Sequence, residues 1–272
     1  TTRLPDCWRA YVGNRCCVRG IWSHGFWRWI FPSGVAQRGG SLEDNTMSDK
    51  QADHYTEEHR WLVERVLAET RETARLTGLG ELGSRVIEAM ATTPRHCFVA
   101  PEQQDLAYAD MPLPIGRGQT ISQPFIVALM TELLAPGPED VVLEVGTGSG
   151  YQAAVLAHLV RQVYTLERIP ELADIATQRL RELGVANVAV RAGDGVQGWQ
   201  EQAPFDGIIV TAAAAEVPPA LVRQLKPGGR LVIPVGPPHR TQDLRVLEKD
   251  AQGVVCSRSV LPVVFVPLID GG

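Results

Sequence analysis

The chain has 272 residues, of which 44% are apolar and 21% charged, and its net charge at pH 7 is −5. This composition is typical of a globular protein of one or two domains, and it argues against a general nucleic-acid binder, which needs a basic surface. No apolar run approaches the roughly 18 residues of a membrane helix, and five cysteines without a C-x-x-C pair favour reduced thiols and a cytoplasmic protein.

Residues 1–46 differ in composition from the rest of the chain. They contain six Arg, no Lys, three acidic residues and four of the six Trp, and glycines interrupt any periodicity. We expect an irregular, non-essential N-terminal extension, since Met47 opens a segment typical of a protein start. Two alternatives are a contact with a membrane surface or a partner, for which Trp and Arg are suited, and an integral part of the fold.

The later part of the chain alternates between predicted strands and helices. Apolar periodicity, interrupted by Gly and Pro, sets their limits. We expect helices over 55–79, 84–91, 125–134, 153–160, 170–183 and 218–225, a loop over 101–118, strands over 141–145, 163–167, 187–195, 204–213 and 230–236, and an antiparallel pair over 243–249 and 260–268. This order predicts an α/β fold with a doubly wound, mostly parallel sheet in a domain over 116–272, after a helical segment and loop over 47–115.

A glycine-rich turn follows the first predicted strand of the sheet. Gly146, Gly148 and Gly150 let the backbone approach a ligand closely, and the next helix presents free N–H groups. Glu144 lies inside the strand and Glu167 ends the next one, where a carboxylate can bind ribose hydroxyls. The G-x-G-x-G spacing favours S-adenosylmethionine over a nicotinamide or flavin cofactor. A purely structural turn is the third interpretation.

Other polar residues fall where ligands gather, at the carboxyl ends of parallel strands. Asp194, followed by Gly195, is placed to accept a hydrogen bond from an adenine amino group, although a turn aspartate that binds its own backbone would look the same. Thr211 ends the fourth strand on the same side. Thr120 and Ser122 precede a helix, so simple capping is their alternative interpretation.

Several segments together resemble the bacterial protein-L-isoaspartate O-methyltransferases. They are Pro-Arg-His-Cys-Phe-Val at 94–99, Met-Pro-Leu-Pro-Ile at 111–115, Gly-Gln-Thr-Ile-Ser-Gln-Pro at 118–124, Leu-Glu-Val-Gly-Thr-Gly-Ser-Gly-Tyr-Gln at 143–152, Gly-Asp-Gly at 193–195, Pro-Phe-Asp at 204–206, Ile-Ile-Val-Thr-Ala-Ala at 208–213 and Phe-Val-Pro-Leu at 265–268. The segment at 118–124 is specific to this family, whereas many methyltransferases share the glycine motif. Residues 1–46 lie outside the resemblance.

The resemblance implies a Rossmann-like methyltransferase fold in which the order of the last strands is altered. It also implies methyl transfer from S-adenosylmethionine to the α-carboxylate of L-isoaspartyl residues in damaged proteins, and it makes Ser122 the active-site serine. A carboxylate has a pKa near 4 and is already ionised at neutral pH, so no general base is needed. We therefore expect Ser122 to position the substrate as a donor, helped by Thr120 and Thr211.

The remaining expectations concern the cofactor and the partners. We expect Glu144 to neutralise the cofactor's ammonium group, Glu167 to hold its ribose and Asp194 to contact its adenine. The full predicted cofactor set is Glu144, Gly146, Thr147, Gly148, Gly150, Glu167, Asp194 and Gly195. We expect no metal and a monomer that binds damaged proteins rather than nucleic acid or membranes. The alternatives are a methyltransferase for another carboxylate or nitrogen acceptor, and a cofactor-binding protein without catalysis.

Overall fold

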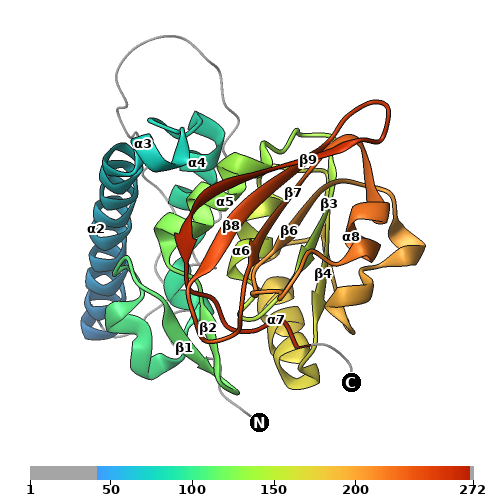
Figure 1. The fold of residues 1–272 in the computed structure, drawn as a ribbon. Helices are drawn as coiled ribbons and strands as arrows, with labels where there is room; N and C mark the ends of the chain where they lie inside the picture. Colours follow the sequence, from blue (N-terminus) through green and yellow to red (C-terminus); the bar gives the residue numbers. More distant parts are fainter. Residues whose placement is uncertain (1–41, 270–272) are drawn as a thin grey trace. The chain divides into compact units, whose positions relative to one another are not determined.

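The computed structural model describes residues 42–269, with side chains from residue 55 onward (Figure 1). The predicted extension over residues 1–46 lies outside the described residues, except that 42–46 belong to helix α2. The chain divides into two units, residues 1–58 and residues 59–272. The description below concerns the second unit, and the domain limits expected from the sequence stay predictions.

The first helices differ in part from their predicted limits. Helix α2 (Leu42–Glu72) begins earlier than expected and is followed by the short helix α3 (Ala74–Thr77), while α4 (Ser84–Thr92) confirms the expected helix at 84–91. Leu62 and Val66 of α2 are buried, whereas Trp61, which is also apolar, is 56% exposed. One residue turns a helix by about 100°, which moves Trp61 away from the stripe that Leu62 begins.

The expectation of a loop over 101–118 is wrong in part. After the 3₁₀ helices η1 (Arg95–Phe98) and η2 (Pro101–Leu106), strands β1 (Leu113–Gly116) and β2 (Gln119–Ile121) form an antiparallel hairpin. The connection bends at residues 116–118, which all have positive φ, including the non-glycine Arg117 at 54°. Gly and Pro indicate a turn locally, and the pairing that makes this turn a hairpin is not local.

The central sheet has seven strands in the order β5-β4-β3-β6-β7-β8-β9. Their limits are β3 (Val141–Val145), β4 (Gln162–Glu167), β5 (Val188–Ala192), β6 (Phe205–Val210), β7 (Leu225–Val235), β8 (Gln242–Lys249) and β9 (Val255–Val263). The first five strands are parallel, and β8 pairs antiparallel with both β7 and β9. This confirms the doubly wound, mostly parallel sheet with a closing antiparallel pair, although the strand expected over 260–268 is observed as Val255–Val263. Lys-Pro-Gly-Gly at 226–229, a sequence typical of a turn, lies inside β7.

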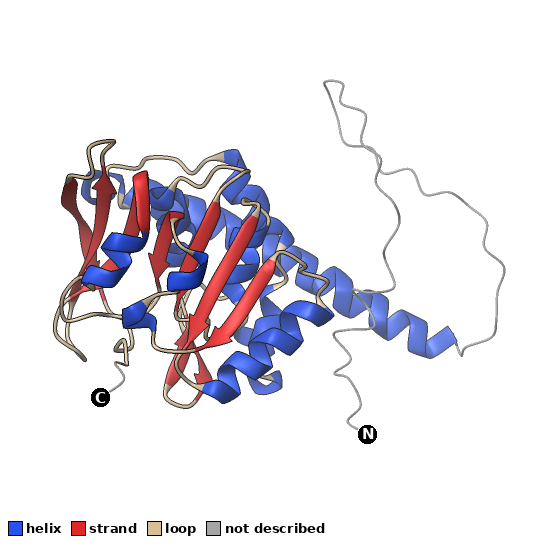
Figure 2. Ribbon diagram, turned by 90° about the vertical axis from the view of Figure 1, so that its right-hand side faces the viewer, coloured by secondary structure: helices blue, strands red, loops and turns tan. Residues whose placement is uncertain are grey.

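Helices lie on both sides of this sheet (Figure 2). They are α5 (Pro124–Leu134), α6 (Tyr151–Ala157), α7 (Pro170–Glu182) and α8 (Pro219–Gln224). Because both faces are covered, the central strands are almost wholly apolar: Val142, Leu143 and Ile208 have no exposed surface. Among the described residues, no helix combines the length and apolarity needed to cross a membrane.

A buried pair of histidines near α4 gives the fold a predicted sensitivity to acid. His96 Nδ1 lies 2.6 Å from the Tyr108 hydroxyl, and His59 Nε2 lies 2.7 Å from the Met90 carbonyl oxygen. Burial lowers the pKa of both imidazoles, and burial together with the neighbouring His59 lowers that of His96 to about 4. Between pH 6.5 and 4 the unfolded chain therefore binds more protons than the folded chain. As the pH drops through this window, the free energy of unfolding decreases.

We expect His96 alone to remove on the order of 2–3 kcal/mol of unfolding free energy between pH 7 and pH 4. Urea unfolding at both pH values checks this for the wild type and for His96→Asn, in which the loss should be smaller. His239→Asn is the matched control, because His239 is exposed and should leave the acid response unchanged. Equal acid losses in the wild type and His96→Asn would contradict the assignment.

Candidate active site

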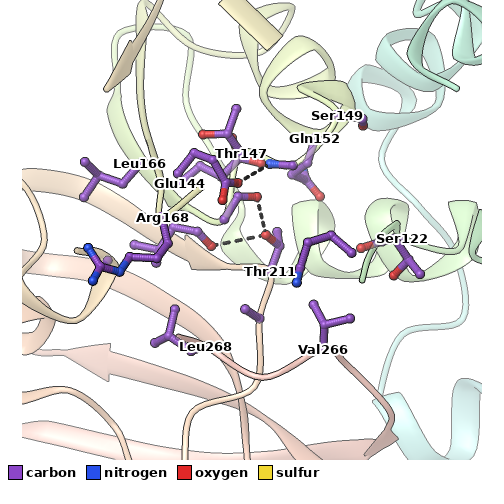
Figure 3. A pocket seen from close by; sticks show the side chains of 18 of the residues that line it. Ser122, Glu144, Thr147, Ser149, Gln152, Leu166, Arg168, Thr211, Val266 and Leu268 are labelled. Carbon is purple, nitrogen blue, oxygen red and sulfur yellow. Dashed lines mark hydrogen bonds between the residues drawn. The ribbon is translucent and has the colours of Figure 1, made fainter. Parts of the chain in front are cut away.

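A pocket opens where β3, β4 and β6 end (Figure 3). Its lining comes mainly from five segments, residues 119–122, 144–149, 166–169, 211–212 and 266–269. The carboxyl ends of parallel strands meet at one edge of a sheet, so segments that are far apart in the chain converge there. In Figure 3, Ser122 lies on the opposite side of the pocket from Leu166 and Arg168.

The glycine turn after β3 requires glycine at its first position. Gly146, Gly148 and Gly150 have φ values of 103°, 52° and 88°, which side-chain-bearing residues rarely adopt. A Cβ at Gly146 would also lie 2.4 Å from Thr211 Oγ1. The Thr211 hydroxyl uses this space to donate to the Gly146 carbonyl oxygen at 2.6 Å. Thr211 therefore fastens β6 to the glycine turn at the edge of the pocket.

Glu167 ties the same turn to β4. One carboxylate oxygen accepts a hydrogen bond from the Gly148 amide at 2.7 Å, and the other accepts from the Ile169 amide at 2.9 Å. A carboxylate oxygen has more than one lone pair, so each can accept a further hydrogen bond. Glu167 lines the pocket. It therefore holds the turn in place and can also accept hydrogen bonds from the hydroxyl groups of a ligand.

Glu144 is fully buried within β3 at the base of the pocket. Its Oε2 accepts a hydrogen bond from the Thr165 hydroxyl at 2.6 Å, and its Oε1 has no hydrogen-bond partner among the described residues. Burial raises the pKa of Glu144 to about 8; the bond from Thr165 opposes this rise, and the charge of Glu167 adds to it. The carboxyl group is therefore largely protonated at neutral pH and would ionise beside a bound cation.

Thr147 contacts this buried carboxyl group indirectly. Its hydroxyl lies 2.7 Å from the Thr165 hydroxyl, which lies 2.6 Å from Glu144 Oε2. Thr147 also lines the pocket, and its contact with the cofactor stays a prediction.

The Ser122 side of the pocket is held by a buried arginine. Arg95 has no exposed surface, and its guanidinium donates to the carbonyl oxygens of Ala107 at 2.9 Å, Met111 at 3.3 Å and Ser122 at 2.9 Å. These contacts fix the Ser122 backbone, while its hydroxyl makes no hydrogen bond within the described residues. Thr120 is exposed in β2 and pairs with Pro114 across the hairpin.

Comparisons with known proteins identify the family. Residues 74–272 match the protein-L-isoaspartate(D-aspartate) O-methyltransferase family. The chain belongs to this family. It is 56% identical to protein-L-isoaspartate O-methyltransferase 2 of Syntrophobacter fumaroxidans, over 77% of this chain and 85% of that protein, and 56% identical to protein-L-isoaspartate O-methyltransferase 2 of a Polaromonas species, over 76% of this chain and 98% of that protein.

Solved structures of isoaspartate methyltransferases share the fold. One protein-L-isoaspartate O-methyltransferase superposes with a TM-score of 0.65 at 28% identity, over 77% of this chain and 66% of that chain. A Plasmodium falciparum protein assigned to the same class superposes with a TM-score of 0.64 at 25% identity, over 78% of this chain and 99% of that chain. The latter structure contains S-adenosyl-L-homocysteine. The Rossmann-like methyltransferase fold expected from the sequence is thus confirmed.

Most of the residues expected in an isoaspartyl methyltransferase site lie in the pocket. Those that line it are Thr120, Ser122, Glu144, Gly146, Thr147, Gly148, Glu167, Gly195 and Thr211. Gly150 begins helix α6 just behind the turn. Asp194 is not among the described residues that line the pocket, and its Oδ1 accepts a hydrogen bond from the Val196 amide at 3.0 Å. Its contact with adenine stays a prediction.

Sequence reasoning missed two parts of this methyltransferase pocket. Gln152 lines the pocket, and its side-chain amide nitrogen donates a hydrogen bond to Thr131 at 2.9 Å. Its Oε1 has no hydrogen-bond partner among the described residues. The segment 266–269 forms another wall, which backbone hydrogen bonds to Ala213 hold in place. Both lie in stretches that resemble the family, so the signal was present, but only the fold brings 266–269 to the pocket.

Proposed function

We propose that this pocket binds S-adenosylmethionine and an L-isoaspartyl residue of a damaged protein, and that methyl transfer to the α-carboxylate takes place there. The protein is a repair methyltransferase of this class, as its family membership establishes. The observation that carries the assignment of the site is that the family-specific segment 118–124 brings Ser122 into the same pocket as the glycine turn.

The residues present fit the cofactor. Glu144 Oε1 is a buried acceptor without a partner among the described residues, which suits the ammonium group of a methionine moiety. Glu167 can accept hydrogen bonds from ribose hydroxyls, and Gly146 and Gly148, which have positive φ, let the backbone of the turn approach a ligand closely. S-adenosylmethionine supplies a methyl group bound to a positively charged sulfur.

The chain's own residues have a simple task in this reaction. The substrate carboxylate is ionised at neutral pH, so no residue has to remove a proton. The Ser122 hydroxyl donates a hydrogen bond that orients the carboxylate without protonating it, and Thr120 lies beside it at the pocket edge. Apolar lining residues such as Leu166 and Leu268 exclude water, which leaves the carboxylate less solvated and more reactive.

We further infer a cytoplasmic monomer that binds damaged proteins and neither nucleic acid nor membranes. The net charge of −5 supports this proposal. The methyltransferase domain would comprise residues 116–272, with residues 47–115 as a helical segment before it.

The decisive experiment measures methyl transfer from labelled S-adenosylmethionine to two synthetic peptides of one sequence, one with L-isoaspartate and one with L-aspartate. We expect label only in the first peptide. Label in neither peptide, with the cofactor still bound, would redirect the proposal to another carboxylate or to a nitrogen acceptor.

Glu167→Ala is expected to weaken S-adenosylmethionine binding by about 1–3 kcal/mol, the value of hydrogen bonds to a charged acceptor. Isothermal titration calorimetry measures the dissociation constant. Glu167→Gln is the matched control: it keeps an acceptor for the Gly148 amide but removes the charge, so its loss should be smaller. A dissociation constant that Glu167→Ala leaves unchanged would remove this residue from the cofactor site.

A further inference from the structure

Two carboxyl groups meet directly behind the turn that carries Ser122. Glu69 of α2 and Asp110 of the loop before β1 each place an oxygen 3.3 Å from the same atom, the side-chain amide nitrogen of Gln123. Gln123 follows Ser122 in the chain. The second oxygen of Asp110 accepts a hydrogen bond from the Phe125 amide at 2.9 Å. Three segments are therefore joined next to the active-site serine.

Asp110 caps helix α5 from a distant part of the chain. The residue before this eleven-residue helix, Gln123, makes no capping hydrogen bond with its side chain, and Pro124 at the first position has no amide hydrogen. The Phe125 amide is thus the first free donor of the helix, and Asp110 satisfies it. An acidic group at this end is also favoured by the helix dipole. The start of α5, and with it the turn at Ser122, depends on where Asp110 is held.

Both carboxyl groups converge on one amide nitrogen, where two ionised carboxylates would repel each other and one retained proton would relieve that repulsion. Burial, the hydrogen bond to Asp110 and the charge of Asp110 raise the pKa of Glu69 to about 7. The charge of Arg65 and the hydrogen bond from Gln123 oppose this rise. Arg65 lies 3.9 Å from Glu69 on the same helix, and the buried Arg95 faces Asp110 from η1. Two acids that converge on one amide nitrogen are thus placed to retain one proton between them.

We propose that Glu69 and Asp110 share one proton and act together as positioning residues for Ser122, a role that rests on the function proposed above. With the proton in place, the pair joins α2 to the start of α5 and fixes the Ser122 turn. When the proton is lost, the two carboxylates repel and the turn loosens. Productive binding of the isoaspartyl peptide should then weaken as the pH rises above neutrality.

Other groups do not account for such a pH response. The substrate carboxylate is ionised over the whole range from pH 6 to pH 9, and the hydroxyl groups of Ser122 and Thr120 do not titrate there. Glu144 titrates near pH 8, but it lies in the predicted cofactor part of the pocket. Saturating S-adenosylmethionine therefore separates its effect from that of the carboxyl pair.

The test is a pH profile of kcat/KM for an L-isoaspartyl peptide at saturating S-adenosylmethionine. From pH 6.5 to pH 8.5 the wild type should lose up to about twentyfold, as expected when one protonated form with a pKa near 7 disappears. Glu69→Gln mimics the protonated acid, so its kcat/KM should stay near the wild-type value at pH 6.5 throughout. Glu69→Ala should be low at every pH. Glu72→Gln is the matched control, because Glu72 pairs with Arg65 but not with Gln123.

A Glu69→Gln profile that follows the wild type, or a flat wild-type profile, overturns the proposal. Carbon-13 NMR titration of the side-chain carboxyl groups tests the shared proton without any turnover. Glu69 should titrate near neutrality in the wild type and at a lower pH in Asp110→Asn, where burial still raises its pKa but the hydrogen bond and the charge of Asp110 are gone. If no peptide is methylated, the proposed function fails, but this titration still shows whether Glu69 and Asp110 share a proton. A wild-type Glu69 that titrates near pH 4.5 contradicts the pair in either case.

Discussion

Replacing Arg95 by Met should lower the unfolding free energy by about 3–5 kcal/mol, the largest loss we expect from a single side chain outside the apolar core. Met fills much of the same space but cannot donate a hydrogen bond. The carbonyl oxygens of Ala107, Met111 and Ser122 would then lose the donor that joins them. Each unsatisfied buried carbonyl costs about 1–3 kcal/mol, reduced where the chain relaxes toward water.

Urea unfolding of the wild type, Arg95→Met and Arg95→Lys measures this loss. Lys keeps the charge but reaches fewer carbonyl oxygens than the planar guanidinium, so Arg95→Lys should lie between the other two. Arg75 is an exposed arginine of α3, and Arg75→Met is the control for the loss of an arginine as such. Buried charges can be replaced by apolar groups without loss in some proteins, and an unchanged stability of Arg95→Met would place this protein among them.

The second large effect concerns turnover rather than stability. Ser122→Ala should lower kcat by about 10- to 100-fold, which corresponds to the 1.5–3 kcal/mol of a hydrogen bond to a charged group. The cofactor's dissociation constant should not change, because Ser122 lies across the pocket from Leu166 and Arg168 at the end of β4 (Figure 3). The melting temperature should also stay constant, since the hydroxyl has no hydrogen-bond partner to lose among the described residues.

Steady-state kinetics with an isoaspartyl peptide and calorimetry with S-adenosylmethionine separate the two quantities. Ser122→Thr retains a hydroxyl donor and should recover part of the rate. Losses of equal size in turnover and in cofactor affinity would instead mean that Ser122 shapes the pocket as a structural residue.

Local patterns were sufficient to predict most of the parallel sheet. Strands such as β3 and β6 are buried on both faces, so they read as short apolar runs, and glycines or prolines mark their ends. The hairpin at 113–121 could not be predicted in this way, because its Pro114 and Gly116 indicate an irregular chain and only the pairing with β2 orders them. The exposed Trp61 shows that an apolar side chain does not by itself define the buried stripe of a helix.

In the site, too, the residues that a local pattern marks could be predicted, and those placed only by the tertiary structure could not. The glycine turn, Glu144 and Glu167 are set by one strand-turn-helix unit and the next strand, so spacing along the chain reveals them. Arg95 and Glu69 act on the Ser122 turn from separate elements. Nothing in their neighbouring residues marks them as parts of a site. Their roles emerge only when the tertiary structure places three backbone carbonyls or a second carboxyl group beside them.

The pocket lining begins at Gln119 and ends at Ile269, so the first hairpin, the middle of the sheet and the segment after β9 all contribute to it. A ligand bound there contacts parts of the chain that separate on unfolding. Its binding therefore stabilises the folded state without a covalent bond. Binding at a hundred times the dissociation constant adds about 2.7 kcal/mol to the folded state. Saturation with the methyl donor should thus make the protein unfold at a higher temperature or urea concentration.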